Sequence, residues 1–164
     1  MTPIIRPMVP ADWPVCRDIY REGIATKRAT FETDTPSWAA WDQSHLPDGR
    51  LVADNEGTVA GWAALSPVSD RCAYVGVAEA SIYVAAEARG QGIGTALMLA
   101  LINGAEAAGI WTIQAGIFPM NHQSLALAES TGFRRVGVRE RIGKLDGAWQ
   151  DVILLERRSS IVGG

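Results

Sequence analysis

The chain has 164 residues, of which 48% are hydrophobic and 20% are charged, so it is long enough to bury the core of one domain. Its 15 Lys and Arg residues against 18 Asp and Glu residues give a formal net charge of -3 at pH 7. That balance excludes long-range attraction to nucleic acid or to an anionic membrane surface, so an anionic ligand has to be held by local groups.

The two cysteines, Cys16 and Cys72, lie far apart and lack the clustered spacing of a zinc site, a redox pair or a disulfide framework. They are expected to be free thiols in a reducing compartment. The first residues contain no basic segment followed by an apolar run, and no stretch approaches the roughly 18 apolar residues of a membrane span. We therefore expect a cytoplasmic protein that binds no metal.

The first half of the chain predicts two helices and a β-hairpin. An amphipathic helix follows a short strand at residues 4–5, and a second helix begins near residues 35–37, where a hydroxyl residue beside proline suits a helix start. Residues 51–53 and 58–65 are β-prone runs, and residues 54–57 between them contain the Asp, Asn and Gly of a tight reversal.

The second half predicts alternating strands and helices in one domain, residues 1–158, followed by a loose C-terminal tail at residues 159–164. Its longest strand candidate precedes a glycine cluster, and an apolar repeat of helical spacing follows that cluster. The expected elements are strands at 73–84, 111–117, 133–137 and 149–155, and helices at 95–108 and 121–131.

The glycine-rich turn at residues 89–95 lies between an expected strand and an expected helix. Its glycines permit positive φ angles and let backbone N–H groups approach an anion, while the helix dipole and Arg89 add positive charge. A P-loop would need Lys after the last glycine, but no Lys follows Gly94. A dinucleotide fingerprint would need glycine where Leu97 stands.

Arg89, Gly92 and Gly94 fit the pattern Arg/Gln-x-x-Gly-x-Gly/Ala, which resembles the coenzyme A pyrophosphate loop of the GNAT acetyltransferases. Asn121, with a Gly-Phe pair at residues 132–133, is similar to another motif of that family. The resemblance implies the GNAT fold, an α/β (α+β) domain with a central mixed, mostly antiparallel sheet of about six to seven strands flanked by about four helices. It also implies acetyl-CoA as co-substrate. The structural alternative is a helix-entry turn without a ligand.

The segments at residues 29–33 and 79–84, and the Gly-x-Trp-x-Asp motif at residues 147–151, look like those of the phosphinothricin N-acetyltransferase family. This similarity extends over residues 4–156. It implies a homodimer that acetylates the α-amine of a small amino-acid analogue with an α-carboxylate and a second tetrahedral head, such as phosphinothricin or methionine sulfoximine.

Two further segments, residues 66–74 and 116–119, resemble the arsinothricin-resistance branch of that family, an antibiotic-resistance function. The branch acts on amino acids that carry an arsinate or a phosphinate. A substrate of this kind needs cations nearby, and a guanidinium can bind its carboxylate or its phosphinate through two parallel hydrogen bonds. Arg71 is the first candidate, and its alternative is a surface arginine in a loop.

Glu79 is the only acidic residue of the strand expected at residues 73–84, and it matches a glutamate of the family segment. An amine attacks a thioester only when it is neutral, so we expect the Glu79 carboxylate to accept its proton as general base. The alternative is a solvent-facing charge or an ion-pair partner. The backbone N–H of Val84 is expected to stabilise the charge that builds on the acetyl oxygen.

By the same resemblance, the cofactor contacts are expected from the strand end, the glycine turn and the helix near Asn121. They are Ile82, Tyr83, Val84, Arg89, Gly90, Gln91, Gly92, Ile93, Gly94, Thr95, Asn121 and Ser124. Tyr83 and Val84 are expected to contact the cofactor mainly through their backbone. Asn121 is expected to bind the pantetheine arm or the substrate side of the thioester, to cap its helix, or to do both.

The substrate contacts expected from the resemblance are Phe31, Glu32, Arg71, Tyr74 and Glu79. Phe31 and Glu32 are expected to frame the amine with an aromatic wall and a carboxylate. The motif residues Trp149 and Asp151 are assigned to packing or to a dimer contact.

One position departs from the family pattern. Many GNAT proteins have Tyr, and phosphinothricin relatives have His, at the position that is Ala128 here, where an acid would stand near the leaving sulfur. No ionisable side chain is therefore available at this position. Two rival functions remain open: acetylation of peptide or protein N-termini, and non-catalytic sensing of acetyl-CoA.

Overall fold

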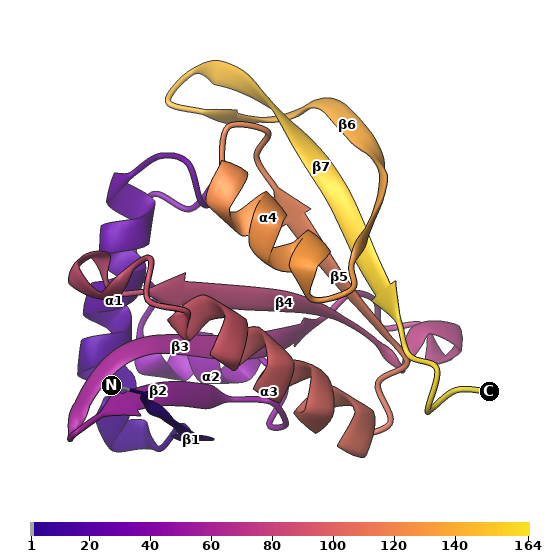
Figure 1. Ribbon diagram of the computed structural model, residues 1–164. Helices are drawn as coiled ribbons and strands as arrows, with labels where there is room; N and C mark the ends of the chain where they lie inside the picture. Colours follow the sequence, from indigo (N-terminus) through magenta and orange to yellow (C-terminus); the bar gives the residue numbers. More distant parts are fainter. Residues whose placement is uncertain (1) are drawn as a thin grey trace.

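The computed structural model describes residues 2–164 (Figure 1), and within them the chain forms seven strands and four α-helices. The strands are β1 (Ile4–Pro7), β2 (Leu51–Asn55), β3 (Thr58–Pro67), β4 (Val77–Val84), β5 (Thr112–Ile117), β6 (Arg134–Leu145) and β7 (Ala148–Arg158). The helices are α1 (Trp13–Ala25), α2 (Trp38–Ser44), α3 (Ile93–Ala107) and α4 (His122–Ser130).

The strands form one sheet in the order β1-β2-β3-β4-β5-β7-β6. Neighbouring strands are antiparallel except β4 and β5, which run parallel. The parallel pair is short, from Val77 opposite Thr112 to Glu79 opposite Gln114, and beyond it the two strands diverge, as Figure 1 shows. The mixed, mostly antiparallel sheet with flanking helices confirms the fold that the resemblance implies.

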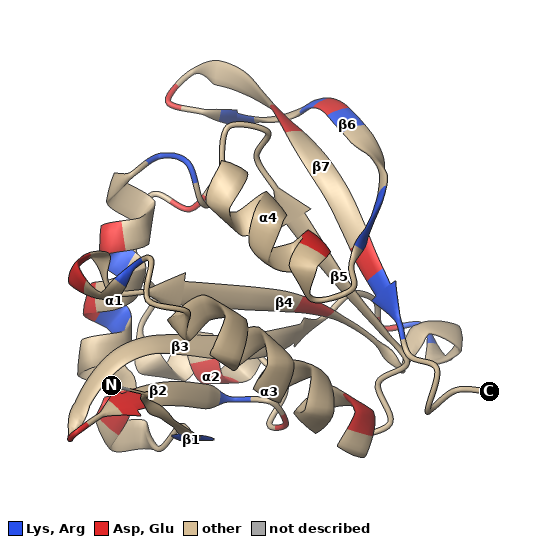
Figure 2. Ribbon diagram, in the orientation of Figure 1, with Lys and Arg blue, Asp and Glu red and all other residues tan. Residues whose placement is uncertain are grey.

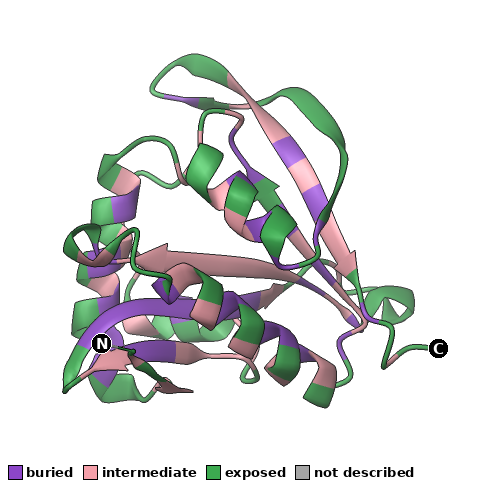
Figure 3. Ribbon diagram, in the orientation of Figure 1, coloured by how far each residue is buried: buried purple, intermediate pink, exposed green. Residues whose placement is uncertain are grey.

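Two apolar clusters cover the two faces of the sheet. Helix α3 covers one face, where its Leu97 and Leu101 are fully buried. Helix α1 covers the other face, where Cys16 and Ile19 pack with Trp62 of β3. Strand β3 is therefore buried along most of its length (Figure 3), and it holds β4 in place beside it.

Both tight hairpins close through two residues with positive φ. Glu56 (φ 53°) and Gly57 (φ 89°) connect β2 to β3, and Asp146 (φ 50°) and Gly147 (φ 78°) connect β6 to β7. Positive φ at both central residues gives a twist that matches paired strands. The reversal expected at residues 54–57 from their Asp, Asn and Gly content is therefore present.

Two strands differ from their expected bounds by four residues or more. The strand expected at residues 73–84 begins only at Val77, because Cys72–Tyr74 form a short 3-10 turn, η2. The strand expected at residues 133–137 continues as β6 to Leu145, because it pairs with β7 as far as the hairpin turn.

The C-terminal residues, which the sequence predicts to form a loose tail, make hydrogen bonds to the rest of the domain. Ser159 is buried, and its backbone N–H donates to the carbonyl of Trp111 (2.8 Å). The Arg158 guanidinium donates to the carbonyl oxygens of Ser159 (2.8 Å) and Val162 (2.9 Å). These bonds hold the last residues against the start of β5.

Candidate active site

A cleft with a volume of about 1510 Å³ opens where β4 and β5 separate. Its walls come from the loop after α1, from β4, the glycine turn and α3, and from β5, α4 and the β6–β7 hairpin. Thirteen residues expected from the sequence line it: Phe31, Glu79, Ile82, Tyr83, Val84, Arg89, Gly90, Gly92, Ile93, Gly94, Thr95, Asn121 and Ser124. The structure therefore brings most of the expected site together.

The backbone of β4 has free hydrogen-bonding groups along this cleft. The N–H of Ala85 donates to Ala60 of β3 (2.8 Å), so residue 85 faces β3. Successive residues of a strand direct their backbone groups to opposite edges, so those of Ile82 and Val84 face the β5 side. The pairing with β5 ends at Glu79, and no strand within residues 2–164 pairs with this edge of Ile82 and Val84. The Val84 N–H is therefore an available donor.

The expectation that Tyr83 offers its backbone to the cofactor does not fit this alternation. Tyr83 lies opposite Trp62 in the β3–β4 ladder, and its ring stacks on Trp62 (5.0 Å between centroids). Burial raises the pKa of the Tyr83 phenol. Tyr83 is therefore a neutral wall of the cleft, and Val84 carries the free backbone N–H.

The Glu79 carboxylate lies at the last paired position of β4 and β5. Gln114, opposite it on β5, donates from Nε2 to Glu79 Oε1 (3.4 Å). A side chain at Gly116 would begin 4.0 Å from the same oxygen, so this glycine leaves space beside the carboxylate. No Lys or Arg among residues 2–164 forms an ion pair with Glu79. The structure thus gives no support to a role as an ion-pair partner.

Sequence reasoning missed Gln114. No local pattern distinguishes it, because its importance comes from the parallel register that sets residue 114 beside residue 79. The only signal was its place in the strand expected at residues 111–117.

The glycine turn has the backbone of an anion site. Gly90 (φ 76°) and Gly92 (φ 82°) both have left-handed conformations, and Gly92 caps the start of α3. The first helical bond runs from the Ala96 N–H to the Gly92 carbonyl (3.1 Å). The N–H groups of residues 93–95 therefore precede the helical ladder and are oriented outward at the positive end of α3.

Arg89 and Gln91 flank these glycines differently. Arg89 lines the cleft and donates from Nε to the Val84 carbonyl (3.3 Å). Gln91 does not line the cleft, and its Nε2 donates to the Glu87 carbonyl (3.5 Å). The structure therefore places Arg89 with the site and leaves Gln91 outside it.

Helix α4 closes the cleft on the side of α3. Asn121 Oδ1 accepts from the Ser124 N–H (3.2 Å), so Asn121 is the N-cap of α4. A Cβ on Gly94 would lie 3.2 Å from Leu127 Cδ2, and this close approach sets the distance between α3 and α4. Ala128 lines the floor of the cleft and is only 1% exposed, so the departure from the family pattern falls at the site itself.

The expected substrate residues are only partly brought together. Phe31 lines the cleft and stacks edge-on against Phe118 (4.8 Å). Glu32 lies instead in a second hollow beside the β6–β7 turn. Arg71 is exposed at η2, outside both hollows, with its guanidinium over the ring of Tyr74 (5.6 Å).

Two basic residues that sequence reasoning did not select line the cleft, Arg28 and Arg139. Figure 2 shows the basic positions on the loop after α1 and on β6, and the acidic position on β4.

No cluster of three or more potential metal ligands occurs in the described part of the chain. None of the helices in residues 2–164 has both the length and the apolar character needed to cross a membrane.

Comparison with known sequences identifies the relatives of this chain. Residues 13–133 match the profile of the acetyltransferase (GNAT) family. The phosphinothricin N-acetyltransferase of Streptomyces coelicolor is 34% identical over 93% of this chain and 94% of its own length. The L-methionine sulfoximine/L-methionine sulfone acetyltransferase of Pseudomonas aeruginosa is 28% identical over 95% of this chain and 94% of its own length.

The solved structures that are similar to this chain include two further acetyltransferases. A phosphinothricin acetyltransferase from Sinorhizobium meliloti, in complex with acetyl-CoA, has a TM-score of 0.90 and 34% identity over 99% of this chain and 91% of that chain. The ribosomal-protein-alanine N-acetyltransferase from Brucella melitensis has a TM-score of 0.88 and 31% identity over 95% of this chain and 99% of that chain. Profile, identity and fold together show that this chain belongs to the GNAT acetyltransferase family and, within it, to the phosphinothricin N-acetyltransferase family.

Proposed function

We propose that this protein transfers the acetyl group of acetyl-CoA to the α-amine of a small amino-acid analogue of the phosphinothricin or methionine sulfoximine type. The observation that carries the proposal is the divergence of β4 and β5 just after Glu79 and Gln114, which sets a carboxylate and the free N–H of Val84 along one opening. An amine bound there lies between a proton acceptor and a hydrogen-bond donor for the developing negative charge.

The glycine turn fits the pyrophosphate of acetyl-CoA. Left-handed Gly90 and Gly92 leave open space where side chains would otherwise stand, and the amides of residues 93–95 supply donors at the helix end. Arg89 adds a cation at the same rim. When bound, acetyl-CoA supplies the thioester carbonyl that the amine attacks.

Glu79 acts as the general base in this proposal. The amide of Gln114 orients the carboxylate through the hydrogen bond to Oε1, which leaves Oε2 for the amine or for a bridging water. The space beside Gly116 gives that proton acceptor access to the substrate. The proton of the attacking amine therefore passes to Glu79.

The N–H of Val84 stabilises the charge on the acetyl oxygen, and removal of one such donor typically costs an enzyme about 3 kcal/mol of transition-state stabilisation. With Ala128 beneath the site, no side chain at that position protonates the departing thiolate. A thiol has an ordinary pKa of about 8.5, so it leaves as a thiolate at little cost near neutral pH.

The relatives support small amino-acid analogues as acceptors, since their names specify phosphinothricin and methionine sulfoximine. Arsinothricin is a third proposed acceptor, based on the segments at residues 66–74 and 116–119. Assembly as a homodimer in the cytoplasm is proposed on the same family resemblance.

A second candidate function is acetylation of an N-terminal alanine, because a ribosomal-protein-alanine N-acetyltransferase shares the fold at 31% identity. The experiment measures the release of free coenzyme A from acetyl-CoA with phosphinothricin, arsinothricin, methionine sulfoximine or an alanine-initiated peptide as acceptor. Release with the amino-acid analogues supports the proposal. Release with the peptide alone assigns the protein to N-terminal acetylation, and tight acetyl-CoA binding without any release supports a sensor.

A further inference from the structure

Within the described residues, the cleft lining contains three arginines, Arg28, Arg89 and Arg139, and no lysine. They divide between its two ends. Arg89 precedes the glycine turn and is bonded to the Val84 carbonyl, so it belongs with the pyrophosphate site. The other two come from the loop after α1 and from β6, which approach the cleft from the opposite side.

A chain of contacts connects Arg139 to the Glu79 end of the cleft. Gly116 lies beside the Glu79 carboxylate, and a Cβ on Gly116 would lie 3.1 Å from Val152 Cγ1. Val152 is directly opposite Arg139 in the β6–β7 ladder, so the two side chains project from the same face of the hairpin. Both line the cleft. Arg139 therefore lies one strand farther from Glu79 than Val152 does.

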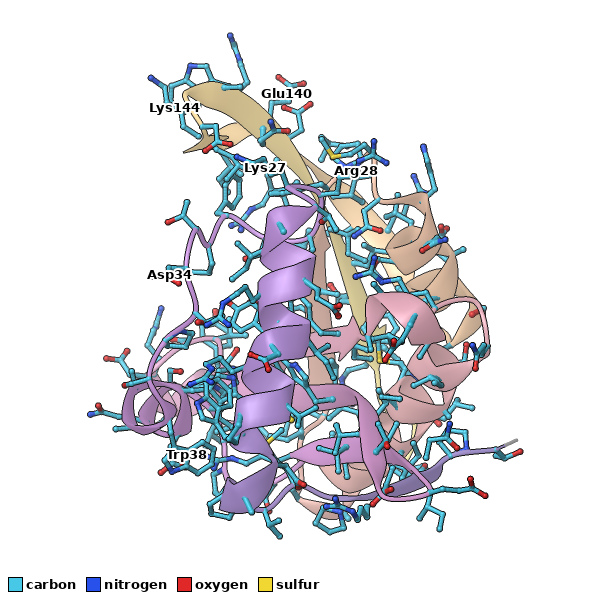
Figure 4. The ribbon with its side chains drawn as sticks, turned by 90° about the vertical axis from the view of Figure 1, so that its left-hand side faces the viewer. Lys27, Arg28, Asp34, Trp38, Glu140 and Lys144 are labelled. Carbon is cyan, nitrogen blue, oxygen red and sulfur yellow. The ribbon has the colours of Figure 1, made fainter. Side chains whose placement is uncertain are left out.

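A second chain of contacts brings the loop that carries Arg28 to the same hairpin. Arg28 belongs to the loop that contains Phe31, and the Phe31 ring packs against Phe118 and against Gly143 of β6. A Cβ on Gly143 would lie 3.0 Å from that ring, so the loop and β6 are in direct contact. Figure 4 shows Lys27 and Arg28 at the end of α1, beneath the hairpin that carries Glu140 and Lys144.

A bulge in β6 directs this part of the hairpin toward the cleft. Three β6 residues, 140–142, stand opposite Asp151 alone, between the pairs Arg139–Val152 and Gly143–Gln150. Arg141 has a positive φ of 45°, and its N–H donates to Asp151 Oδ1 (2.8 Å). Such bulges bend a strand and change the direction of its side chains.

Neither Arg28 nor Arg139 has a side-chain partner within the described residues. Other basic residues around them do: Lys27 pairs with Asp146, and Arg134, on the same strand as Arg139, pairs with Glu156 (3.2 Å). Glu140 lies next to Arg139 in sequence but does not line the cleft and forms no ion pair with either arginine. Two charged guanidinium groups are therefore available at the cleft wall.

We propose that Arg28 and Arg139 together bind the anionic head group of the acceptor, the phosphinate or arsinate distal to its α-amine. This inference rests on the proposed function. The α-amine and α-carboxylate share one carbon, so both stay beside Glu79, whereas the head at the end of the side chain extends toward the loop and the hairpin. Guanidinium groups bind such tetrahedral anions through paired, charge-assisted hydrogen bonds. Arg28 and Arg139 replace Arg71, which lies outside this cleft, as the cations for that group.

The test compares two acceptors that share an α-amino acid and differ in the charge of the head, phosphinothricin (anionic) and L-methionine sulfone (neutral). Arg28→Gln and Arg139→Gln should each lower kcat/KM for phosphinothricin about 10- to 100-fold, mainly through KM, because each removes a charge-assisted hydrogen bond. The same variants should change kcat/KM for the sulfone by less than about threefold and leave acetyl-CoA affinity unchanged. Arg139→Lys should retain part of the lost activity, because it keeps the charge without the paired geometry.

Arg134→Gln is the matched control, since it removes a paired arginine from the same strand outside the cleft. Three outcomes would overturn the inference but not the proposed function. They are equal losses with both acceptors, no loss in either variant, and a phosphinothricin-selective loss in Arg71→Gln instead. Wild-type acetylation of the sulfone but not of phosphinothricin would also overturn it. Wild-type silence with both acceptors would reject the proposed function, and the inference with it.

Discussion

Gln114 Nε2 lies 3.4 Å from Glu79 Oε1 at the last paired position of β4 and β5. The two side chains therefore meet where the sheet opens, and the carboxylate is both oriented by its neighbour and accessible from the cleft. This relationship follows from the parallel register of two strands that are separated in sequence by a helix and a glycine turn.

Removing the charge of Glu79 should slow the reaction without affecting the cofactor. Glu79→Gln keeps the size of the side chain but cannot accept the amine proton, so kcat at neutral pH should fall about 100-fold or more. Coenzyme A affinity, measured by calorimetry, should stay unchanged because the glycine turn is intact. An unchanged kcat would show that another group accepts the proton.

Gly92 should be required for cofactor binding because of its backbone conformation. Its φ of 82° costs a residue with a Cβ about 1–2 kcal/mol, and relaxing that strain would turn the N–H groups of the α3 terminus away from the ligand. Gly92→Ala should weaken coenzyme A binding about tenfold or more.

Gly57→Ala is the matched control for Gly92→Ala. Gly57 also has a positive φ (89°) and open space around its Cα, but it lies in the β2–β3 turn, outside the cleft. Both variants should lose similar thermal stability, and only Gly92→Ala should lose coenzyme A affinity. Equal affinity in the two would contradict a pyrophosphate site at the glycine turn.

Asp151 should affect the acceptor more than the cofactor, because it holds the β6 bulge through the Arg141 N–H. Asp151→Ala removes that acceptor, at a cost of about 1–3 kcal/mol for the unpaired group, and should raise KM for the amino-acid acceptor. Asp151→Asn keeps an oxygen at the same position and should retain most activity. Steady-state kinetics with each substrate varied in turn distinguish the two effects, and equal KM values in wild type and Asp151→Ala would contradict this role.

Acid should destabilise the N-terminal part of the fold through Asp12. Hydrogen bonds from the Arg6 guanidinium, both 2.9 Å, lower the pKa of this buried carboxyl below its ordinary value of 3.8. A lowered folded-state pKa stabilises the protein above pH 3.8, and this contribution is lost as the pH falls through the folded pKa. Asp12→Asn should lower the free energy of unfolding at pH 7 by about 1.5–3 kcal/mol.

Urea unfolding at several pH values measures this effect. The difference between wild type and Asp12→Asn should shrink as the pH falls below about 4. Asp18→Asn removes an exposed partner of Arg21 and should change the free energy of unfolding by less than about 1 kcal/mol. A gap between wild type and Asp12→Asn that stays constant down to pH 2 would show that the charge of Asp12 does not contribute.

The sequence alone predicted the helices, the β2–β3 turn and the glycine turn before α3, because these features depend on residues close together in the chain. The apolar repeat of α3, the Asp-Gly pair of the β6–β7 turn and the glycines at residues 90 and 92 each carry their signal within one local segment. The family motifs are equally local. Most of the site residues that they predicted line the cleft, including Glu79.

The tertiary structure decided which distant residues meet. Glu79 reaches Gln114 only through the register of β4 and β5, and the loop of Arg28 reaches the hairpin of Arg139 because Phe31 packs against β6. The same long-range packing leaves Arg71 outside the cleft, although a local motif selected it. Strand register and the place where a sheet opens arise from the burial of both sheet faces, a property of the whole chain that no segment encodes by itself.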